Sequence, residues 1–348
     1  MKTIFTHRTL VAALLAAACL CGGKRAYGQD FTFSQFYEQP LLRNPALAGM
    51  FTGDLRVSMA YRDQWGSVTV PFRTASLSIE HKIPVGTQSD VLTVATQMSV
   101  DGAGDIRLKR TQFMPCINFH KSLSENRDTY LSAAFMGGLV SSQFDATQIK
   151  FGDQFRNGSY DAGNPTSQVL TNSGYNYWDM SAGLCFSTTF GDKTNFYAAA
   201  GIAHLTNPVI RSSTGNAPGL LKPRFSFNLG VNAPSGEHGH ITAFADYFSQ
   251  AGNHQLLGGL LYGINIMEYD NSDPDILYFG SFMRWDDALI PTLKIGLAHF
   301  NIGVSYDVNI SKLKVVSNWR GGLELSIVYK DFLKIRNSTL DRLRCTRF

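Results

Sequence analysis

Residues 225–232 read FSFNLGVN. Large apolar side chains (Phe225, Phe227, Leu229 and Val231) alternate there with small or polar ones (Ser226, Asn228, Gly230 and Asn232). Strict alternation predicts a β-strand with one apolar and one polar face. A soluble sheet turns polar residues outward, whereas a transmembrane β-barrel turns its apolar face to lipid and its polar face to the lumen. The stretch is therefore compatible with a soluble sheet or a transmembrane β-barrel, and the rest of the chain has to decide between them.

The same alternation recurs along the chain, for example in 91–100 (VLTVATQMSV) and 301–309 (NIGVSYDVN). It predicts about fourteen strands, an even number as most single-chain outer-membrane barrels have. The predicted strands are 54–63, 72–83, 90–101, 109–121, 128–141, 175–189, 195–204, 222–233, 239–249, 254–266, 276–285, 289–297, 300–309 and 320–330. A secreted β-sandwich or propeller is the alternative, but strand after strand has Leu, Val, Phe, Tyr or Ile on one face. We predict an all-β fold, an antiparallel transmembrane β-barrel.

The predicted connections differ in length at the two ends of this barrel. If the N-terminus is periplasmic, the connections after even-numbered strands are periplasmic, and all of these are short. The two longest connections, 142–174 and 205–221, follow odd-numbered strands and would face outward. Short periplasmic turns and long extracellular loops are typical of outer-membrane barrels, which supports the strand count.

Composition agrees with a membrane barrel. Only 17% of the residues are charged and 12% are aromatic, and after residue 28 no apolar run approaches the length of a membrane helix. The formal net charge of +4 comes from Lys2, Arg8, Lys24 and Arg25, so residues 29–348 carry 27 basic and 27 acidic side chains. This balance gives no reason to expect a nucleic-acid partner.

The first residues predict export. Lys2 and Arg8 precede a short apolar run, 10–20. Ala26-Tyr27-Gly28 then places small residues where signal peptidase requires them. We expect cleavage before Gln29 and an outer-membrane location; a lipoprotein signal with Cys19 or Cys21 as the acylated residue is the alternative. The predicted organisation is a signal peptide (1–28), an N-terminal segment (29–53), the barrel (54–330) and a basic periplasmic tail (331–348).

No motif in the sequence indicates catalysis. There is no nucleophile elbow, zinc-protease motif or P-loop. His238 and His240 in a predicted tight turn could hold a metal only with a third ligand, so a solvated turn is the simpler interpretation. Cys116, Cys185 and Cys345 form no disulfide framework or metal pair. We expect no enzyme activity, no metal and no cofactor.

Two segments carry structural hypotheses. Tyr61-Arg62-Asp63-Gln64-Trp65 either closes a strand with an aromatic girdle or places Arg62 in the lumen, where Asp307 is its candidate partner because an unpaired buried charge is costly. The second segment, 33–51 (FSQFYEQPLLRNPALAGMF), contains Pro40 and Pro45, which bar long regular structure. We expect it to plug or clasp the periplasmic mouth of the barrel; an irregular connection to the first strand is the alternative.

Three motifs together resemble the PorP/SprF family of Bacteroidetes outer-membrane proteins. The first two are Asn44-Pro45-Ala46 with Gly49, and Tyr61-Arg62-Asp63-Gln64-Trp65. The third is GVSYDVNISKL (303–313), with Tyr306, Asp307, Asn309 and Ser311, followed by GGLELS (321–326). The chain ends Cys345-Thr346-Arg347-Phe348 where the family would have Cys-Pro-Arg-Phe, a departure that affects only the tail. The similarity covers essentially the whole chain after the predicted signal.

The resemblance implies an outer-membrane component of the type IX secretion system or of the linked gliding and adhesin-export machinery. Its implied partners are outer-membrane lipid, periplasmic ring and motor-associated proteins, and a secreted surface adhesin. A FadL-like transporter of hydrophobic small molecules is the alternative, since that family also has fourteen strands and an N-terminal hatch with Asn-Pro-Ala. A small polar lumen and a short N-terminal segment argue against it. A general porin is a third option, which a plugged lumen would exclude.

Overall fold

The computed structural model describes residues 30–66, 70–85, 89–124, 128–168, 172–191, 194–210, 219–269, 272–312 and 314–333. The predicted signal peptide, and the predicted tail beyond residue 333, lie outside these residues. Residues 32–348 form one compact unit, the second of the two into which the chain divides. All elements described below belong to the second unit.

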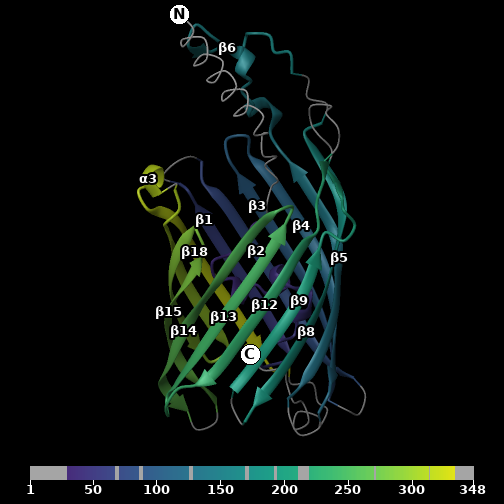
Figure 1. Cartoon of the computed structure of the whole chain (residues 1–348), viewed down its shortest axis with the longest axis vertical. Helices are drawn as coiled ribbons and strands as arrows, with labels where there is room; N and C mark the ends of the chain where they lie inside the picture. Colours follow the sequence, from purple (N-terminus) through teal and green to yellow (C-terminus); the bar gives the residue numbers. More distant parts are fainter. Residues whose placement is uncertain are drawn as a thin grey trace, which may run out of the picture. The chain divides into compact units, whose positions relative to one another are not determined.

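Fourteen strands of this unit close into one antiparallel barrel (Figure 1). Going round the wall, the order is β1-β18-β17-β16-β15-β14-β13-β12-β9-β8-β5-β4-β3-β2, so neighbours in sequence are neighbours in space and β1 pairs with β18 to close the wall. The strands are β1 (Leu55–Gln64), β2 (Phe72–Val85), β3 (Asp90–Ala103), β4 (Leu108–Ser122), β5 (Tyr130–Gln143), β8 (Gly174–Phe190), β9 (Thr194–Ala203), β12 (Arg224–Pro234), β13 (Gly239–Gln250), β14 (Asn253–Tyr269), β15 (Ser272–Arg284), β16 (Ala288–Leu297), β17 (Phe300–Asn309) and β18 (Arg320–Asp331). The predicted fold is confirmed.

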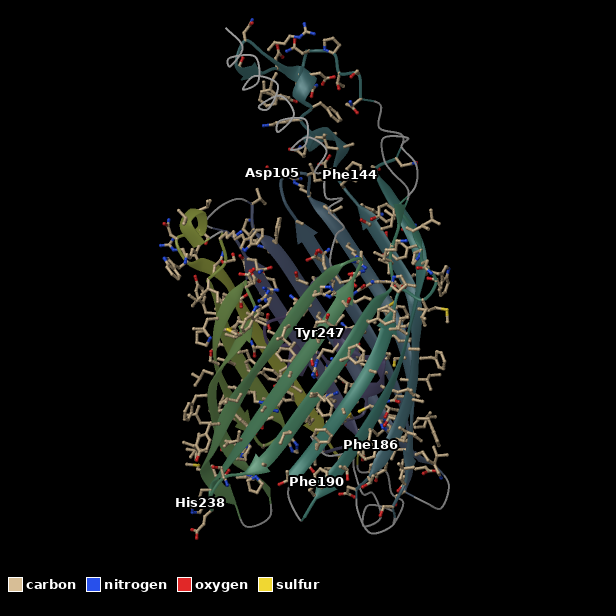
Figure 2. The ribbon with its side chains drawn as sticks, viewed as in Figure 1. Asp105, Phe144, Phe186, Phe190, His238 and Tyr247 are labelled. Atoms are coloured by element: carbon tan, nitrogen blue, oxygen red, sulfur yellow. The ribbon has the colours of Figure 1, made fainter. Side chains whose placement is uncertain are left out.

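The two ends of the barrel differ as expected. Asp105 and Phe144 lie at one end, next to the connections 104–107 and 144–173, while Phe190 and His238 lie at the other (Figure 2). We call the first the long-loop end and the second the short-turn end. The short-turn end has the connections 86–89, 123–129, 191–193, 235–238, 270–271 and 298–299.

The two longest connections at the long-loop end contain small elements that the sequence analysis did not predict. Residues 144–173 include η3 (Ala146–Gln148), η4 (Gly152–Gln154) and a hairpin of β6 (Phe155–Arg156) and β7 (Ser159–Tyr160). Residues 204–223 include a hairpin of β10 (Val209–Ile210) and β11 (Gly219–Leu220), and α3 (Lys314–Ser317) precedes β18. In the first loop, the main-chain N–H of Ser167 donates to Asp153 and holds the pKa of that carboxyl below its usual range.

The wall has an apolar outer face and a polar inner face. On β12, Phe225, Phe227 and Leu229 are 48%, 54% and 48% exposed, whereas Ser226 and Asn228 are buried. Because the sheet is closed, exposed apolar side chains point away from the lumen, which is the arrangement of a barrel surrounded by lipid. No helix in the described part of the chain is long and apolar enough to cross a bilayer.

The hydrophobic core lies inside the barrel, around the segment Phe33–Phe51, which we call the plug. It contains η1 (Phe36–Glu38), α2 (Pro40–Arg43) and η2 (Pro45–Leu47). One apolar cluster joins Leu41, Leu47 and Met50 of the plug to wall residues of β3, β4, β5, β8 and β9. A second joins Phe36 and Tyr37 to β14, β15 and β16. The plug therefore provides the core that the lumen would otherwise lack.

Candidate functional site

The prolines of the plug account for its succession of short helices. Pro40 and Pro45 each begin a helical turn, where a missing N–H costs nothing and the fixed φ favours the helix. Between them, Asn44 is extended and its Oδ1 accepts a hydrogen bond from Ala46 N at 2.9 Å, which caps the second turn. The segment can thus change direction every few residues while its backbone groups stay bonded.

The plug contacts all fourteen strands of the barrel. Its polar and ring contacts reach β1, β2, β4, β9, β12, β13, β15, β16, β17 and β18. Apolar or close main-chain contacts reach β3, β5, β8 and β14. It begins beside Arg62 and Arg284, near the long-loop ends of their strands, and ends beside Arg56 and Lys82, near the short-turn ends. The segment therefore lies inside the lumen, from the level of Arg62 to that of Arg56 on β1, and not only in the expected periplasmic mouth.

The predicted pair of Arg62 and Asp307 is present. Arg62 Nη2 lies 2.7 Å from Asp307 Oδ2, and both side chains are buried. Arg284 Nη2 lies 2.6 Å from the same oxygen, and Ser34 Oγ of the plug donates to the other carboxylate oxygen. Arg62 also donates to the main-chain oxygen of Thr32. One carboxylate thus joins β1, β15 and the start of the plug, and its two arginines compensate the cost of burying it.

Glu324 lies directly opposite Arg62 in the β1–β18 ladder and binds the plug backbone. Its two carboxylate oxygens accept hydrogen bonds from Ser34 N at 2.7 Å and Gln35 N at 2.6 Å. The side chain of Gln35 donates to the main-chain oxygen of Glu324 and accepts from Ser326 Oγ. Gly303 leaves room for the Gln35 side chain, because a Cβ at position 303 would collide with Gln35 Oε1.

Arg43 anchors the middle of the plug. Its Nε and Nη2 each lie 2.6 Å from an oxygen of Asp246 on β13, a bidentate pair, and Nη2 also donates to Tyr197 OH on β9. The guanidinium lies over the rings of Phe36 and Phe244, 5.0 and 5.7 Å from their centroids. The guanidinium is planar, makes two hydrogen bonds to one carboxylate and stacks on aromatic rings, so lysine could not replace it.

Two further ion pairs secure the plug nearer the short-turn end. Glu38 accepts a hydrogen bond from Lys294 Nζ on β16 at 3.0 Å. Glu80 on β2 accepts from Gly49 N of the plug and from Arg56 of β1, each at 2.8 Å. Lys82 Nζ donates to Phe51 O at 2.7 Å. The charges of Glu38 and Lys294, and of Glu80 and Arg56, compensate each other beside the plug.

Two amide side chains and three glycines set how closely the plug approaches the wall. Asn118 Nδ2 donates to both Ala46 O and Ala48 O, at 2.9 and 2.8 Å. A Cβ at Gly183 or Gly201 would collide with Asn44. Gly49 has φ +81°, and a Cβ there would collide with Thr93 Oγ1. These positions require glycine for space, and Gly49 requires it for conformation as well.

A cavity of about 460 Å³ lies on the short-turn side of the plug. Tyr37 and Glu38 of the plug line it, with Arg56, Lys294 and His240 from the wall. Further lining residues, Asn195, His299 and Asp331, sit at the short-turn ends of their strands. Its lining is charged and polar as well as aromatic, unlike the mostly apolar pockets that bind hydrophobic ligands.

The motif residues from the sequence fall into two groups. Arg62, Asp307, Asn44, Pro45, Ala46 and Gly49 meet at the contact between plug and wall, where Pro45 O lies 3.8 Å from Cys116 Sγ. The others do not: Tyr61 and Tyr306 face outward, Gln64 ends β1, and Trp65 packs on Phe72. Asn309 caps the turn after β17 by accepting from Ser311 N and Oγ.

Sequence reasoning missed the other wall anchors, Asp246, Glu80, Glu324 and Arg284. An inward polar position on a strand was a signal available for each, but it does not distinguish an anchor from a residue facing lumenal water. Within the described residues, no group of three His, Cys, Asp or Glu side chains is placed to hold a metal. The arrangement is one of mutually compensated charges that hold a segment in place.

Several solved structures are similar to this chain at low sequence identity. The CymD monoaromatic hydrocarbon channel is similar at 12% identity, over 85% of this chain and 93% of that chain, with a TM-score of 0.43. The toluene transporter TodX of P. putida is similar at 11% identity, over 83% and 92%, with a TM-score of 0.44. The translocator domain of the autotransporter NalP from Neisseria meningitidis is similar at 10% identity, over 85% and 96%, with a TM-score of 0.43. No curated protein matches the sequence.

The family comparison is specific. The family model described as type IX secretion system membrane protein PorP/SprF matches residues 26–329, which include the plug and nearly all of the barrel. The chain belongs to the PorP/SprF family of type IX secretion system membrane proteins.

Proposed function

We propose that this protein serves type IX secretion as a closed outer-membrane barrel that binds other proteins of the machinery, and that cargo does not pass through its lumen. The observation that carries the proposal is the plug, which contacts every strand of the wall from inside the lumen. Family membership supports the secretion role. We expect no enzyme activity.

The orientation follows from the loops. The short-turn end faces the periplasm and the long-loop end faces the cell surface, as is usual in outer-membrane barrels. The cavity of about 460 Å³ then lies on the periplasmic side of the plug. We expect the chain to be exported with a signal peptide cleaved before Gln29.

A conducting lumen would require the plug to leave. Withdrawing it would separate Arg43 from Asp246, Ser34 from Asp307, and Glu38 from Lys294. These contacts would break together, and so would the apolar contacts that Leu41, Leu47 and Met50 make with the wall. A barrel that stays closed and presents its two rims to partners is the more economical interpretation.

The proposed partners follow from the family. Periplasmic ring and motor-associated proteins would meet the short-turn end, and a secreted surface adhesin would meet the long-loop end, with gliding as a linked role. Transport of hydrophobic small molecules is the alternative function. The cavity argues against it, because Glu38, Arg56 and Lys294 line the space that such a molecule would occupy.

The test is deletion of the gene, with quantitative mass spectrometry of medium, cell surface and periplasm. If proteins with type IX C-terminal signals accumulate in the periplasm and disappear from the surface, the secretion role is supported and the trapped proteins name the cargo. Complementation with the intact gene should restore them. An unchanged distribution would contradict the proposal, and uptake of hydrophobic ligands would become the next assay.

A further inference from the structure

The connection between β17 and β18 carries an exposed apolar patch at the long-loop end. In α3, Val315 and Val316 are 78% and 64% exposed, and Val315 is the most exposed large apolar side chain among the described residues. Trp319, just before β18, is 54% exposed. Side chains so exposed are not part of the core of the chain, and apolar residues that cluster in this way mark a contact with a partner or a membrane.

Hydrogen bonds fix this connection, so the exposure is a property of the fold. Asn309 Oδ1 accepts from Ser311 N at 3.0 Å, and Asn309 Nδ2 donates to Ser317 Oγ at 3.2 Å. Trp319 N donates to Lys314 O, and Trp319 O accepts from Asn309 N, which joins the turn to the end of the strand. The turn thus buries Ser317 and holds the two valines before it on the surface.

The length of β17 places this connection at the boundary of the hydrocarbon. Its 10 residues, at about 3.4 Å each and tilted by about 40°, rise about 26 Å, against an apolar band of about 25 Å. The outward side chains of β17 are apolar or aromatic from end to end: Phe300, Ile302, Val304, Tyr306 and Val308. The whole strand therefore lies within the band, and the chain leaves β17 at the level of the lipid headgroups.

The wall is taller elsewhere in the barrel. On β4, the outward side chains nearest the long-loop end are Lys109 and Thr111, both exposed, and the apolar series begins only at Phe113. That strand continues into water above the lipid, whereas β17 ends with the lipid. The patch on α3 is thus continuous with the lipid-facing wall, and the exposed Ile310 lies between the two. Figure 1 shows α3 at the outer margin of the wall, beyond the ends of β1 and β18.

Cations border the patch. The charged residues that follow β17, up to the first residue of β18, are Lys312, Lys314 and Arg320. Lys314 Nζ lies 5.1 Å from the centre of the Trp319 ring, and none of the three cations forms an ion pair with a described residue. In the adjacent turn, 285–287, one of the two acids is already paired with an arginine. Cations beside a tryptophan and exposed apolar side chains suit the membrane interface, where they meet lipid phosphate.

We propose that this connection is a lipid-binding site on the outer leaflet: the two valines of α3 and Trp319 enter the membrane, and the three cations bind the phosphate groups of its lipids. An apolar surface with basic flanks binds anionic membranes through both contributions. A protein partner fits less well, because the patch continues the lipid-facing wall. The choice of leaflet rests on the orientation proposed above, whereas the binding of phosphate-bearing lipid depends neither on it nor on the secretion role.

A photo-crosslinker tests the proposal on the purified full-length protein, in vesicles of equimolar phosphatidylcholine and phosphatidic acid. The crosslinking amino acid p-benzoylphenylalanine is placed at Val316, with Leu325 on the outer wall and Ser159 in the long loop as controls. Positions 316 and 325 should give lipid adducts, and position 159 none. Adducts at 316 alone should favour phosphatidic acid, at least about fivefold, since one cation at an anionic surface contributes about that factor. No lipid adduct at 316, or adducts there without this preference, would overturn the proposal.

Removal of the cations separates the phosphate contact from the apolar one. In Lys312→Gln/Lys314→Gln/Arg320→Gln, lipid adducts at 316 should persist, while their preference for phosphatidic acid falls to about one. The matched control Arg73→Gln/Arg107→Gln/Lys109→Gln removes the same charge at the same end of the barrel and should keep the preference. Equal losses in the two variants would mean that overall charge attracts the lipid, and a protein adduct at 316 in cells would mean that a protein covers the patch. Either result contradicts the proposal.

Discussion

Arg43 of the plug and Asp246 of the wall form a bidentate ion pair, with both N–O distances 2.6 Å and both side chains buried. The two residues lie far apart in sequence, so the pair fixes the plug to the middle of the barrel. Tyr197 donates no charge but completes the site by accepting from the same guanidinium. The position of the plug therefore depends on a small number of contacts that can be removed singly.

Asp246→Ala should weaken the docking of the plug. It leaves the Arg43 guanidinium buried without its carboxylate, which typically costs about 3–5 kcal/mol. The free energy of unfolding in detergent, by urea titration, measures the loss, and hydrogen exchange of residues 41–51 locates it. The double variant Arg43→Met/Asp246→Leu is the control and should recover most of the stability. Equal losses in the single and double variants would refute the pair's role.

Asp307→Asn should be far more disruptive than a matched change at the surface. Asp307 bridges Arg62 and Arg284, both buried, so its loss leaves Arg62 with the longer contact to Glu324 at 3.9 Å and Arg284 with the contact to the exposed Asp287 at 3.3 Å. Asp63→Asn is the control, because Asp63 pairs with Arg73, whose side chain is 62% exposed, and such pairs contribute about 0–1 kcal/mol. Urea unfolding of both variants measures the difference. Comparable stabilities would mean that the buried cluster does not hold the plug.

Gly49→Ala should destabilise the protein more than a glycine change that alters conformation alone. Gly236 has φ +74° and no atom within 4 Å of the place that an added methyl group would take. Gly236→Ala therefore tests the cost of the left-handed φ alone, which is about 1–2 kcal/mol. Gly49→Ala adds the collision with Thr93 and His120, for which overpacking adds about 1–3 kcal/mol. Unfolding free energies of the two variants test the difference. Equal values would place Gly49 in a roomier site than the structure has.

Leu229→Lys should impair folding into a bilayer more than Phe225→Lys. Both residues face outward on β12, but Leu229 is at mid-strand and Phe225 is near the long-loop end. A lysine at the bilayer midplane costs about 2–4 kcal/mol, and one near the interface about 0–1 kcal/mol. Folding yield into lipid vesicles, read from heat-modifiable gel mobility, measures this. The reverse order would contradict the membrane position of the wall.

The barrel could be predicted from sequence because each strand shows its own alternation of apolar and polar residues. Alternation such as FSFNLGVN in 225–232 reports two faces locally, and the even count and loop lengths check one another. The hairpins β6–β7 and β10–β11 were missed because two-residue strands are too short to show a period. They rest on turn geometry and on contacts within their loops.

The site was predictable only in part. Arg62 and Asp307 could be paired because both are inward charges near the barrel closure, where β1 meets β18. Asp246 and Glu80 could not be assigned, because their partners, Arg43 and Gly49, lie on the plug, whose path through the lumen leaves no periodic signal. The contacts with fourteen surrounding strands determine the conformation of the plug, so its path can be known only from the structure.

Electrical recording of the purified full-length protein in planar bilayers shows whether the plug closes the lumen. With the plug in place, we expect no steady ionic conductance from the native protein. We expect openings in Asp246→Ala/Asp307→Asn, in which two anchors of the plug are removed. A steady conductance from the native protein, equal to that of this double variant, would show that the lumen is open and that the plug does not close it.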